Sequence, residues 1–189
     1  MGHSQAEKAQ NRERILEEAA EQIRASGLES LSVGKLMAGV NLTHGGFYGH
    51  FSSRSDLIAQ ALERALREGE EKARASDDPD RPTSASAMVK SYLSRAHRDA
   101  PETGCAIAAL LSDVGRADER CRAVMAPHIE NFIAKAARVL DGESEEQAIL
   151  AVSAMVGALA ISRVITDPRR SDAILRAVRD AVIAMRDED

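Results

Sequence analysis

Thr43, Tyr48 and His50 place three polar side-chain tips within one short segment of the chain. Such tips can donate hydrogen bonds to phosphate oxygens, and contacts of this kind fix how a protein sits on a nucleic acid. Between them lie Gly45 and Gly46, although a glycine inside a helix costs ~1 kcal/mol relative to alanine. A sequence selected for helix stability alone avoids such a pair. We therefore expect the backbone here to approach another surface closely, such as the base edges in a major groove.

The residues before this segment predict the element that would present it. A short helix is expected to begin after Ser32, whose hydroxyl can cap free backbone amides. Asn41 stands where that helix must stop, and asparagine tolerates the left-handed conformation better than other residues that carry a side chain. Thr43 is then the N-cap candidate of the next helix. A helix, a short turn and a second helix in this order are the pattern of a helix-turn-helix.

Longer helices are expected on both sides of this unit. The first has apolar residues at helical spacing up to Gly27, which tolerates the positive φ of a helix end. Ser53 and Asp56 fit a capping box with aspartate in place of glutamate, so a long helix is predicted to start there. A turn-forming stretch at 76–82 marks the expected boundary between two domains. Beyond it we predict five further helices, at 84–98, 104–115, 118–140, 145–166 and 171–186, the last two separated by a break at Asp167-Pro168.

The composition supports an all-α fold of about nine helices. Of the 189 residues, 44% are apolar and 29% are charged, while aromatic residues make up only 3% and tryptophan is absent. Strands favour β-branched and aromatic side chains, whereas this chain is rich in the helix formers alanine, leucine, glutamate and arginine. The net charge of −5 excludes a general electrostatic attraction to nucleic acid, so any DNA contact must come from a local surface.

We expect the protein to be cytoplasmic. Two cysteines do not make a disulfide framework, and the start of the chain does not resemble a signal peptide. The longest apolar stretch, at 148–161, has 14 residues, whereas a bilayer span needs about 20. This stretch is therefore predicted to be a buried helix, and no membrane partner is expected.

Residues 12–57 resemble the DNA-binding domain of the TetR/AcrR family of bacterial transcriptional regulators. The strongest part of the resemblance runs from Leu42 to Phe51 and joins a cap, glycines, an aromatic pair and His-Phe at fixed spacing. The resemblance implies an all-α homodimer with a helix-turn-helix DNA-binding domain at 9–69 and a ligand-binding and dimerisation domain at 76–189. The residues expected to contact double-stranded operator DNA are Ser32, Lys35, Thr43, His44, Gly45, Gly46, Tyr48, His50 and Arg54.

Candidate residues for a small-molecule site are spread over the second half of the chain. They are Met88, Tyr92, Cys105, Met125, His128, Phe132 and Met155. The alternative for the methionines is a place in the core, which methionine at helical spacing commonly fills. His97 and His128 have no further cluster at metal-ligand spacing, so neither a metal nor a cofactor is expected. Cys105, at a predicted helix start, is either a thiol that reacts with oxidants or electrophiles or a small core residue.

The last two predicted helices are expected to pair two copies of the chain. The helix at 145–166 is apolar nearly all round, which is not typical of a helix on the surface of a monomer. The helix at 171–186 adds an apolar face, so two copies would form a four-helix interface.

The resemblance implies a sequence-specific DNA-binding transcriptional regulator, a repressor that a small-molecule effector releases from its operator. The alternative is a DNA-binding adaptor whose C-terminal domain binds a protein partner and no small ligand. We expect no enzymatic activity, because no nucleophile with a base, paired carboxylates or phosphate loop occurs at a recognisable spacing.

Overall fold

The computed structural model describes residues 5–75, 84–139 and 144–185, and within these ranges the secondary structure is entirely helical. The all-α prediction is therefore confirmed. The predicted boundary stretch at 76–82 and the predicted helix ends at 140 and 186 lie outside the described residues. The elements are α1 (Gln5–Ser26), η1 (Leu28–Ser30), α2 (Val33–Gly39), η2 (His44–Gly49), α3 (Arg54–Ala75), α4 (Ala85–Tyr92), α5 (Arg95–Asp99), η3 (Pro101–Thr103), α6 (Ala106–Arg116), α7 (Glu119–Val139), α8 (Glu145–Val164) and α9 (Pro168–Ala184), where η marks a 3-10 helix.

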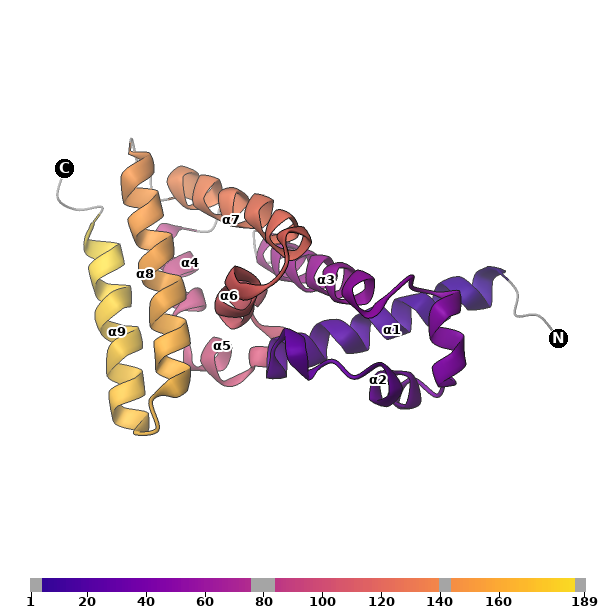
Figure 1. Cartoon of the computed structure of the whole chain (residues 1–189). Coiled ribbons are helices and arrows are strands. Elements are labelled where there is room, and N and C mark those ends of the chain that lie inside the picture. The colour runs from indigo at the N-terminus through magenta and orange to yellow at the C-terminus, as the bar shows by residue number, and fades with distance from the viewer. Residues whose placement is uncertain (1–4, 76–83, 140–143, 186–189) are drawn as a thin grey trace.

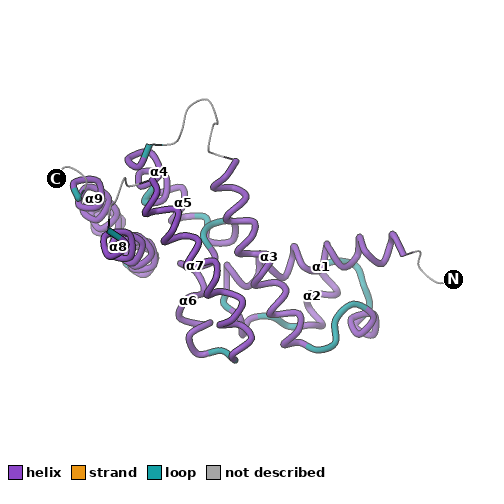
Figure 2. The backbone as a smooth tube through the Cα atoms, turned by 90° about the horizontal axis from the view of Figure 1, so that it is seen from above, coloured by secondary structure: helices purple, strands orange, loops and turns teal. Residues whose placement is uncertain are grey.

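The helices form an elongated molecule with different elements at its two ends (Figure 1). α1, α2 and η2 lie at one end, and α8 and α9 lie side by side at the other, as both views show (Figure 2). α3, α6 and α7 connect the two ends. One hydrophobic core runs through the molecule, from Ile15 and Leu16 of α1 to Val182 of α9. The segment that the sequence singles out for contact therefore stands at one tip of a continuous helical body.

Two local signals end the first two helices as predicted. Gly27 follows α1 with a φ of +85°, and its N–H donates to a carbonyl one turn back at 2.8 Å. Asn41 follows α2 with a φ of +58°. Its N–H donates to the carbonyl of Ala38 at 3.0 Å. The next N–H, of Leu42, donates to the carbonyl of Met37 at 2.8 Å, which completes a Schellman motif and fixes where η2 begins.

The segment after this turn is a 3-10 helix and not the α-helix that the sequence suggests. Its hydrogen bonds span three residues, from the N–H of Gly46 to the carbonyl of Thr43 at 3.0 Å and from the N–H of His50 to that of Phe47 at 2.9 Å. Two adjacent glycines weaken an α-helix, and the segment is too short to compensate for them. η2 is therefore a tight turn of helix that ends at Gly49.

Two further predicted elements have different bounds in the structure. The helix predicted at 84–98 is two helices, because the Ser94 hydroxyl accepts a hydrogen bond from the N–H of His97 at 3.1 Å and starts α5 separately from α4. The break before the last helix is present, but α9 starts at Pro168 and not at 171, since proline loses no hydrogen bond at the first position of a helix. The Asp167 side chain caps α9 by accepting from the N–H of Arg169 at 2.9 Å.

α8 is long and apolar enough to cross a membrane by length and composition, the one such helix in the described residues. The core helix of a soluble protein passes the same test, and α8 packs against both α7 and α9. Met155 and Leu159 of α8 are fully buried, which agrees with the prediction of a buried helix. The large side chains that α8 leaves exposed are Ile149, Leu150, Ile161 and Val164.

A buried arginine joins α1, at the end of the molecule that holds η2, to α3 and η3. Arg24 of α1 is 4% exposed, and its guanidinium lies 2.8 Å from the carboxylate of Glu68 on α3. The same guanidinium donates to the carbonyl of Glu102 in η3. α3 runs through the predicted division between residues 69 and 76, so the two-domain division stays a prediction.

Candidate nucleic-acid interface

One aromatic ring anchors η2 while its neighbours turn outward. Phe47 is 1% exposed, and its ring lies 5.6 Å from that of Phe51 and 5.2 Å from that of Tyr48. Tyr48 itself is 70% exposed, and Thr43 and His44 are also exposed. A single buried side chain therefore holds the turn on the core, and the polar tips predicted to contact DNA lie on the outside.

The glycines of η2 leave an open backbone surface. A Cβ atom added at Gly45 or Gly49 would meet nothing within 4 Å, and one at Gly46 would make only ordinary contacts, 3.5 Å from the Thr43 hydroxyl oxygen. Gly27 is the glycine with positive φ among the described residues, so the η2 glycines are not required by backbone conformation. Neither packing nor geometry explains them. What they provide is space for another molecule to approach the backbone.

Ser32 and Thr43 occupy the N-cap positions of α2 and η2 as predicted, but neither side chain accepts a capping hydrogen bond. The expectation that the Ser32 hydroxyl caps free amides is therefore wrong. Both residues are exposed, as is Lys35 on α2. These hydroxyls and the ammonium group are available to an outside partner at the same end of the molecule.

Arg54 has partners within the protein. Its guanidinium donates to the carbonyls of Leu31 at 3.0 Å and Glu29 at 3.3 Å, and it lies 3.2 Å from the Glu29 carboxylate. It therefore ties the start of α3 to η1. His50 is half-buried, with its ring 6.4 Å from that of Phe51. Arg54 and His50 are better placed to hold η2 in position than to contact DNA themselves. Their contact with DNA stays a prediction.

Two arginines of α1 that the sequence analysis did not single out also hold this end together. Arg14 donates to the carbonyl of Val40 at 2.8 Å, next to the turn that precedes η2. The guanidinium carbon of Arg12 lies 5.1 Å from the centre of the Phe51 ring, a cation–π contact. Their partners are 26 residues away or more, so no local pattern in the sequence reveals them.

The predicted capping box at the start of α3 is present in part, since the Asp56 carboxylate binds the N–H one residue before the capping Ser53. The Ser53 hydroxyl accepts from the N–H of Asp56 at 3.0 Å, and the Asp56 carboxylate accepts from the N–H of Ser52 at 3.1 Å. Hydrogen bonds from Gln60 above all, and then from the Ser52 N–H, hold the pKa of Asp56 well below its usual range. The carboxylate is thus ionised where the positive end of the α3 dipole lies.

Three of the predicted ligand-site residues come together in the second half of the chain. The ring of Tyr92 lies 5.4 Å from that of Phe132, and its hydroxyl donates to the Cys105 sulfur at 3.3 Å. Burial is the main reason that the pKa of Tyr92 lies well above its usual value, and the neighbouring Cys105 adds to the rise. The structure adds His97, whose ring lies 4.8 Å from that of Tyr92.

The contacts of His97 define its protonation state. Its Nε2 accepts from the backbone N–H of Cys105 at 2.9 Å, so the proton is on Nδ1, which donates to the carbonyl of Tyr92 at 2.7 Å. Burial lowers the pKa of His97, and the nearby charge of Arg163 lowers it further. The ring is therefore neutral. The Arg163 guanidinium donates to the carbonyls of His97 at 3.0 Å and Arg98 at 3.1 Å, which holds this corner on α8.

The remaining predicted ligand residues belong to the core or join two helices. Met125 and Met155 are 1% and 0% exposed and belong to the hydrophobic core against which Tyr92, Cys105 and Phe132 also pack, and their contact with a ligand stays a prediction. Met88 is half-buried and packs against the same core. His128 lies between α7 and α3, with Nδ1 2.6 Å from the Glu70 carboxylate. It ties two helices together.

Comparison with known proteins agrees with this architecture. Residues 15–61, which include α2 and η2, match the family model for bacterial regulatory proteins of the tetR family. A TetR-family transcriptional regulator from Streptomyces coelicolor is 26% identical, with 95% of this chain and 97% of that chain covered and a TM-score of 0.68. Residues 15–61 are therefore similar to the tetR family of bacterial regulatory proteins, and the chain as a whole shares the fold of a TetR-family regulator.

Other solved regulators share the fold at lower identity. A TetR-family regulator from Cytophaga hutchinsonii is 19% identical, covers 97% of this chain and 98% of its own, and has a TM-score of 0.79. A transcriptional regulator from Saccharomonospora viridis, solved in complex with choline, is 14% identical, with coverages of 92% and 96% and a TM-score of 0.75. A comparison with curated proteins finds no match.

Proposed function

We propose that this chain is a homodimeric, cytoplasmic repressor of the TetR family that leaves a palindromic operator when a small molecule binds in its C-terminal half. The main observation in favour of DNA binding is the open surface of η2. Its glycines have no role in packing, and Thr43, His44 and Tyr48 are exposed around them. A local surface of this kind allows DNA binding by a chain whose net charge is −5.

The exposed residues divide into two roles in DNA recognition. Ser32, Lys35, Thr43 and Tyr48 have hydroxyl or ammonium tips that suit phosphate oxygens, and they would fix the register of the protein on the duplex. His44 stands at the start of η2, where contacts with base edges cluster, and would read sequence.

The cluster around Tyr92 is the best-supported place for an effector. Two aromatic rings, a neutral imidazole, a thiol and the guanidinium of Arg163 combine apolar walls with a few polar groups, as small-molecule sites do. The choline complex of the Saccharomonospora viridis regulator supports a small ligand for a protein of this fold. Cys105 within the cluster either contacts this ligand or reacts with an electrophile, and the alternative of a purely structural thiol stays open.

Arg24 offers a physical connection from this cluster to the DNA-binding end. Cys105 lies two residues after the end of η3, and the carbonyl of Glu102 in η3 accepts a hydrogen bond from Arg24 of α1. The Arg24 guanidinium is also paired with Glu68 of α3 at 2.8 Å. A ligand that displaces η3 would therefore disturb α1 and α3, the two long helices beside η2.

The exposed apolar face of α8 supports dimerisation. Ile149, Leu150, Ile161 and Val164 are between 43% and 77% exposed in the single chain. If α8 and α9 of one copy packed against α8 and α9 of a second copy, these side chains would be removed from water. The same contact would set the distance between the η2 segments of the two copies.

Selection of binding sites from genomic fragments with the purified protein provides the operator, and a gel-shift titration on that operator tests the proposal. Tyr48→Phe and Thr43→Ala should each weaken binding by ~1 kcal/mol, about fivefold, through the loss of one phosphate hydrogen bond. Wild-type affinity in both variants would mean that η2 does not contact DNA. A thermal-shift screen with small hydrophobic compounds separates an effector-responsive repressor from an adaptor whose C-terminal half binds a protein.

A further inference from the structure

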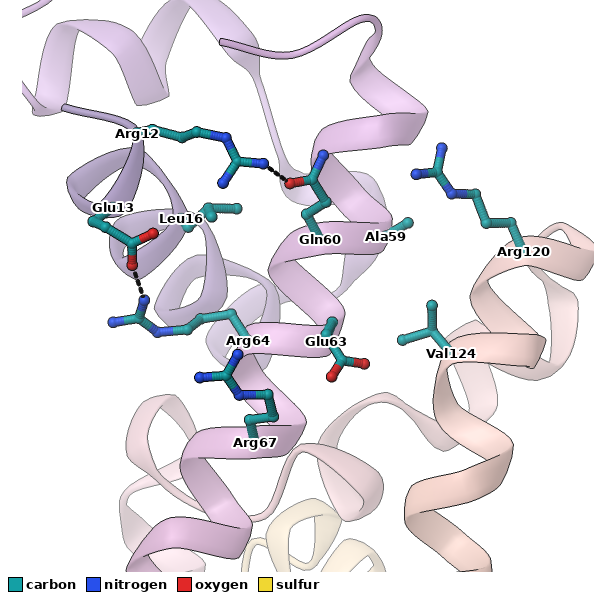
Figure 3. A pocket seen from close by; sticks show the side chains of 10 residues that line it. All are labelled: Arg12, Glu13, Leu16, Ala59, Gln60, Glu63, Arg64, Arg67, Arg120 and Val124. Atoms are coloured by element: carbon teal, nitrogen blue, oxygen red, sulfur yellow. Dashed lines mark hydrogen bonds and ion pairs between the residues drawn. The ribbon is translucent and has the colours of Figure 1, made fainter. Parts of the chain in front are cut away.

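A trough of about 420 Å³ lies over α3 and is flanked by α1 and α7 (Figure 3). Leu16, Ala59 and Val124 give it an apolar floor, one residue from each of the three helices. Arginine side chains from all three helices stand around this floor (Figure 3). The trough shares no residue with the cluster around Tyr92, so it is a separate feature of the molecule.

A chain of hydrogen bonds orients two of these arginines. Arg12 of α1 donates to the side-chain oxygen of Gln60, whose amide nitrogen donates to Asp56 at 2.9 Å. Arg120 of α7 donates to the same Asp56 oxygen at 2.7 Å. Guanidinium groups from two different helices are thus held on either side of Gln60, as the close view shows (Figure 3). Their geometry is set before any ligand arrives.

This group carries an excess of positive charge. Among these four side chains, Arg12 and Arg120 contribute two cations and Asp56 contributes one anion, which accepts from Arg120 directly and is linked to Arg12 only through the neutral Gln60. The local sum is +1, in a chain whose net charge is −5. A guanidinium has several N–H donors in a planar fork, and each of these two spends one on the contacts above.

The other charged side chains that line the trough are paired with neighbours. Arg64 lies 2.6 Å from the carboxylates of both Glu13 and Glu68, so its charge is compensated. Glu63 lies 3.3 Å from Nε2 of His128, and Arg67 faces Glu71 on its own helix at 3.6 Å. The excess charge therefore lies at the end of the trough where Arg12 and Arg120 flank Gln60 (Figure 3).

We propose that Arg12 and Arg120 hold the anionic head group of a small organic phosphate or carboxylate, whose apolar part lies on the floor of the trough. Planar guanidinium forks match the oxygens of both head groups in bidentate fashion. The volume lies within the range of small-molecule sites. This site is additional to the effector site proposed above and does not depend on operator binding.

Isothermal titration calorimetry of the full chain tests the proposal with three probes: phenyl phosphate, benzoate and the neutral benzyl alcohol. We expect the anions, and not the alcohol, to bind the wild type. Arg120→Gln and Arg12→Gln should each weaken anion binding about tenfold, since each removes charge-assisted hydrogen bonds. Arg138→Gln, an exposed arginine near the end of the same helix α7, is the matched control and should bind as the wild type does.

Three results would overturn the proposal. The first is that neither anion binds the wild-type protein. The second is equal anion affinity in the wild type, Arg120→Gln and Arg138→Gln, which would locate the binding elsewhere. The third is that the anions do not bind and Arg120→Gln instead weakens operator binding and flattens its salt dependence, which would make the trough a contact for the DNA backbone. Circular dichroism of each variant confirms that it is folded.

Discussion

Replacing Gly45 with alanine separates the stability of the fold from the DNA binding that we propose. A Cβ at position 45 would meet no atom within 4 Å, and the backbone there has no positive φ. Alanine also leaves the unfolded chain less conformational freedom than glycine does. We therefore expect Gly45→Ala to raise the free energy of unfolding by ~0.4–1 kcal/mol, which is a rise of a few degrees in Tm.

Operator affinity should change in the opposite direction. The added methyl group stands on the exposed surface of η2, where the backbone must come close to the bases. If it removes one contact worth about 1.4 kcal/mol, the operator Kd rises about tenfold. Urea unfolding followed by circular dichroism measures the first quantity, and a gel-shift titration on the selected operator measures the second.

Gly115→Ala is the matched control for this prediction. Gly115 is an exposed helical glycine of α6, and a Cβ there also meets nothing within 4 Å. It should stabilise the fold without changing operator affinity. Wild-type operator affinity in Gly45→Ala would refute close approach of the backbone to DNA. A loss of stability in that variant would refute the conclusion that the fold leaves the space open.

Other predictions concern the junction, the start of α3 and the dimer. Arg24→Met removes a buried donor from the Glu102 carbonyl, while Glu68 keeps Arg64 as a partner, so we expect a cost of about 1–3 kcal/mol and a lower urea midpoint; an unchanged midpoint would contradict this. Hydrogen bonds, first from Gln60, lower the pKa of Asp56, so its stabilisation is present above about pH 4 and is lost as the pH falls further. The free energy of unfolding of Asp56→Asn should therefore change less than that of the wild type between about pH 5 and pH 3. Urea unfolding at several pH values measures both, and parallel curves for the two proteins would contradict this prediction. Light scattering should give a dimer for the wild type and a monomer for Ile161→Glu, and a monomeric wild type at micromolar concentration defeats the dimer proposal.

The parts of the fold that depend on neighbouring residues could be predicted from the sequence. Gly27 and Asn41 end their helices in the left-handed region because the local chain requires it there. Ser53 and Asp56 cap α3 through bonds that span three or four residues. The exposed tips around η2 follow from the same local pattern, with Phe47 as the buried anchor.

The parts that depend on distant residues could not be predicted in this way. The partners of Arg54 lie 23 to 26 residues back along the chain, and those of Arg163 lie 65 and 66 residues back. Apolar residues at helical spacing do not distinguish core from pocket, so the sequence leaves both alternatives open for Met125 and Met155, and the structure shows that both are buried. The trough needs α1, α3 and α7 side by side, which only the tertiary fold provides.

Selection of binding sites with the wild type and with His44→Ala, carried out in parallel, tests the central claim most directly. His44 is exposed at the start of η2, where a base contact would change which sequence is preferred. The wild type should enrich a palindromic site, and His44→Ala should enrich a site that differs at symmetric positions in both halves. No enriched site for the wild type, or the same site with the same preference for both proteins, would contradict the assignment of η2 as the segment that reads DNA.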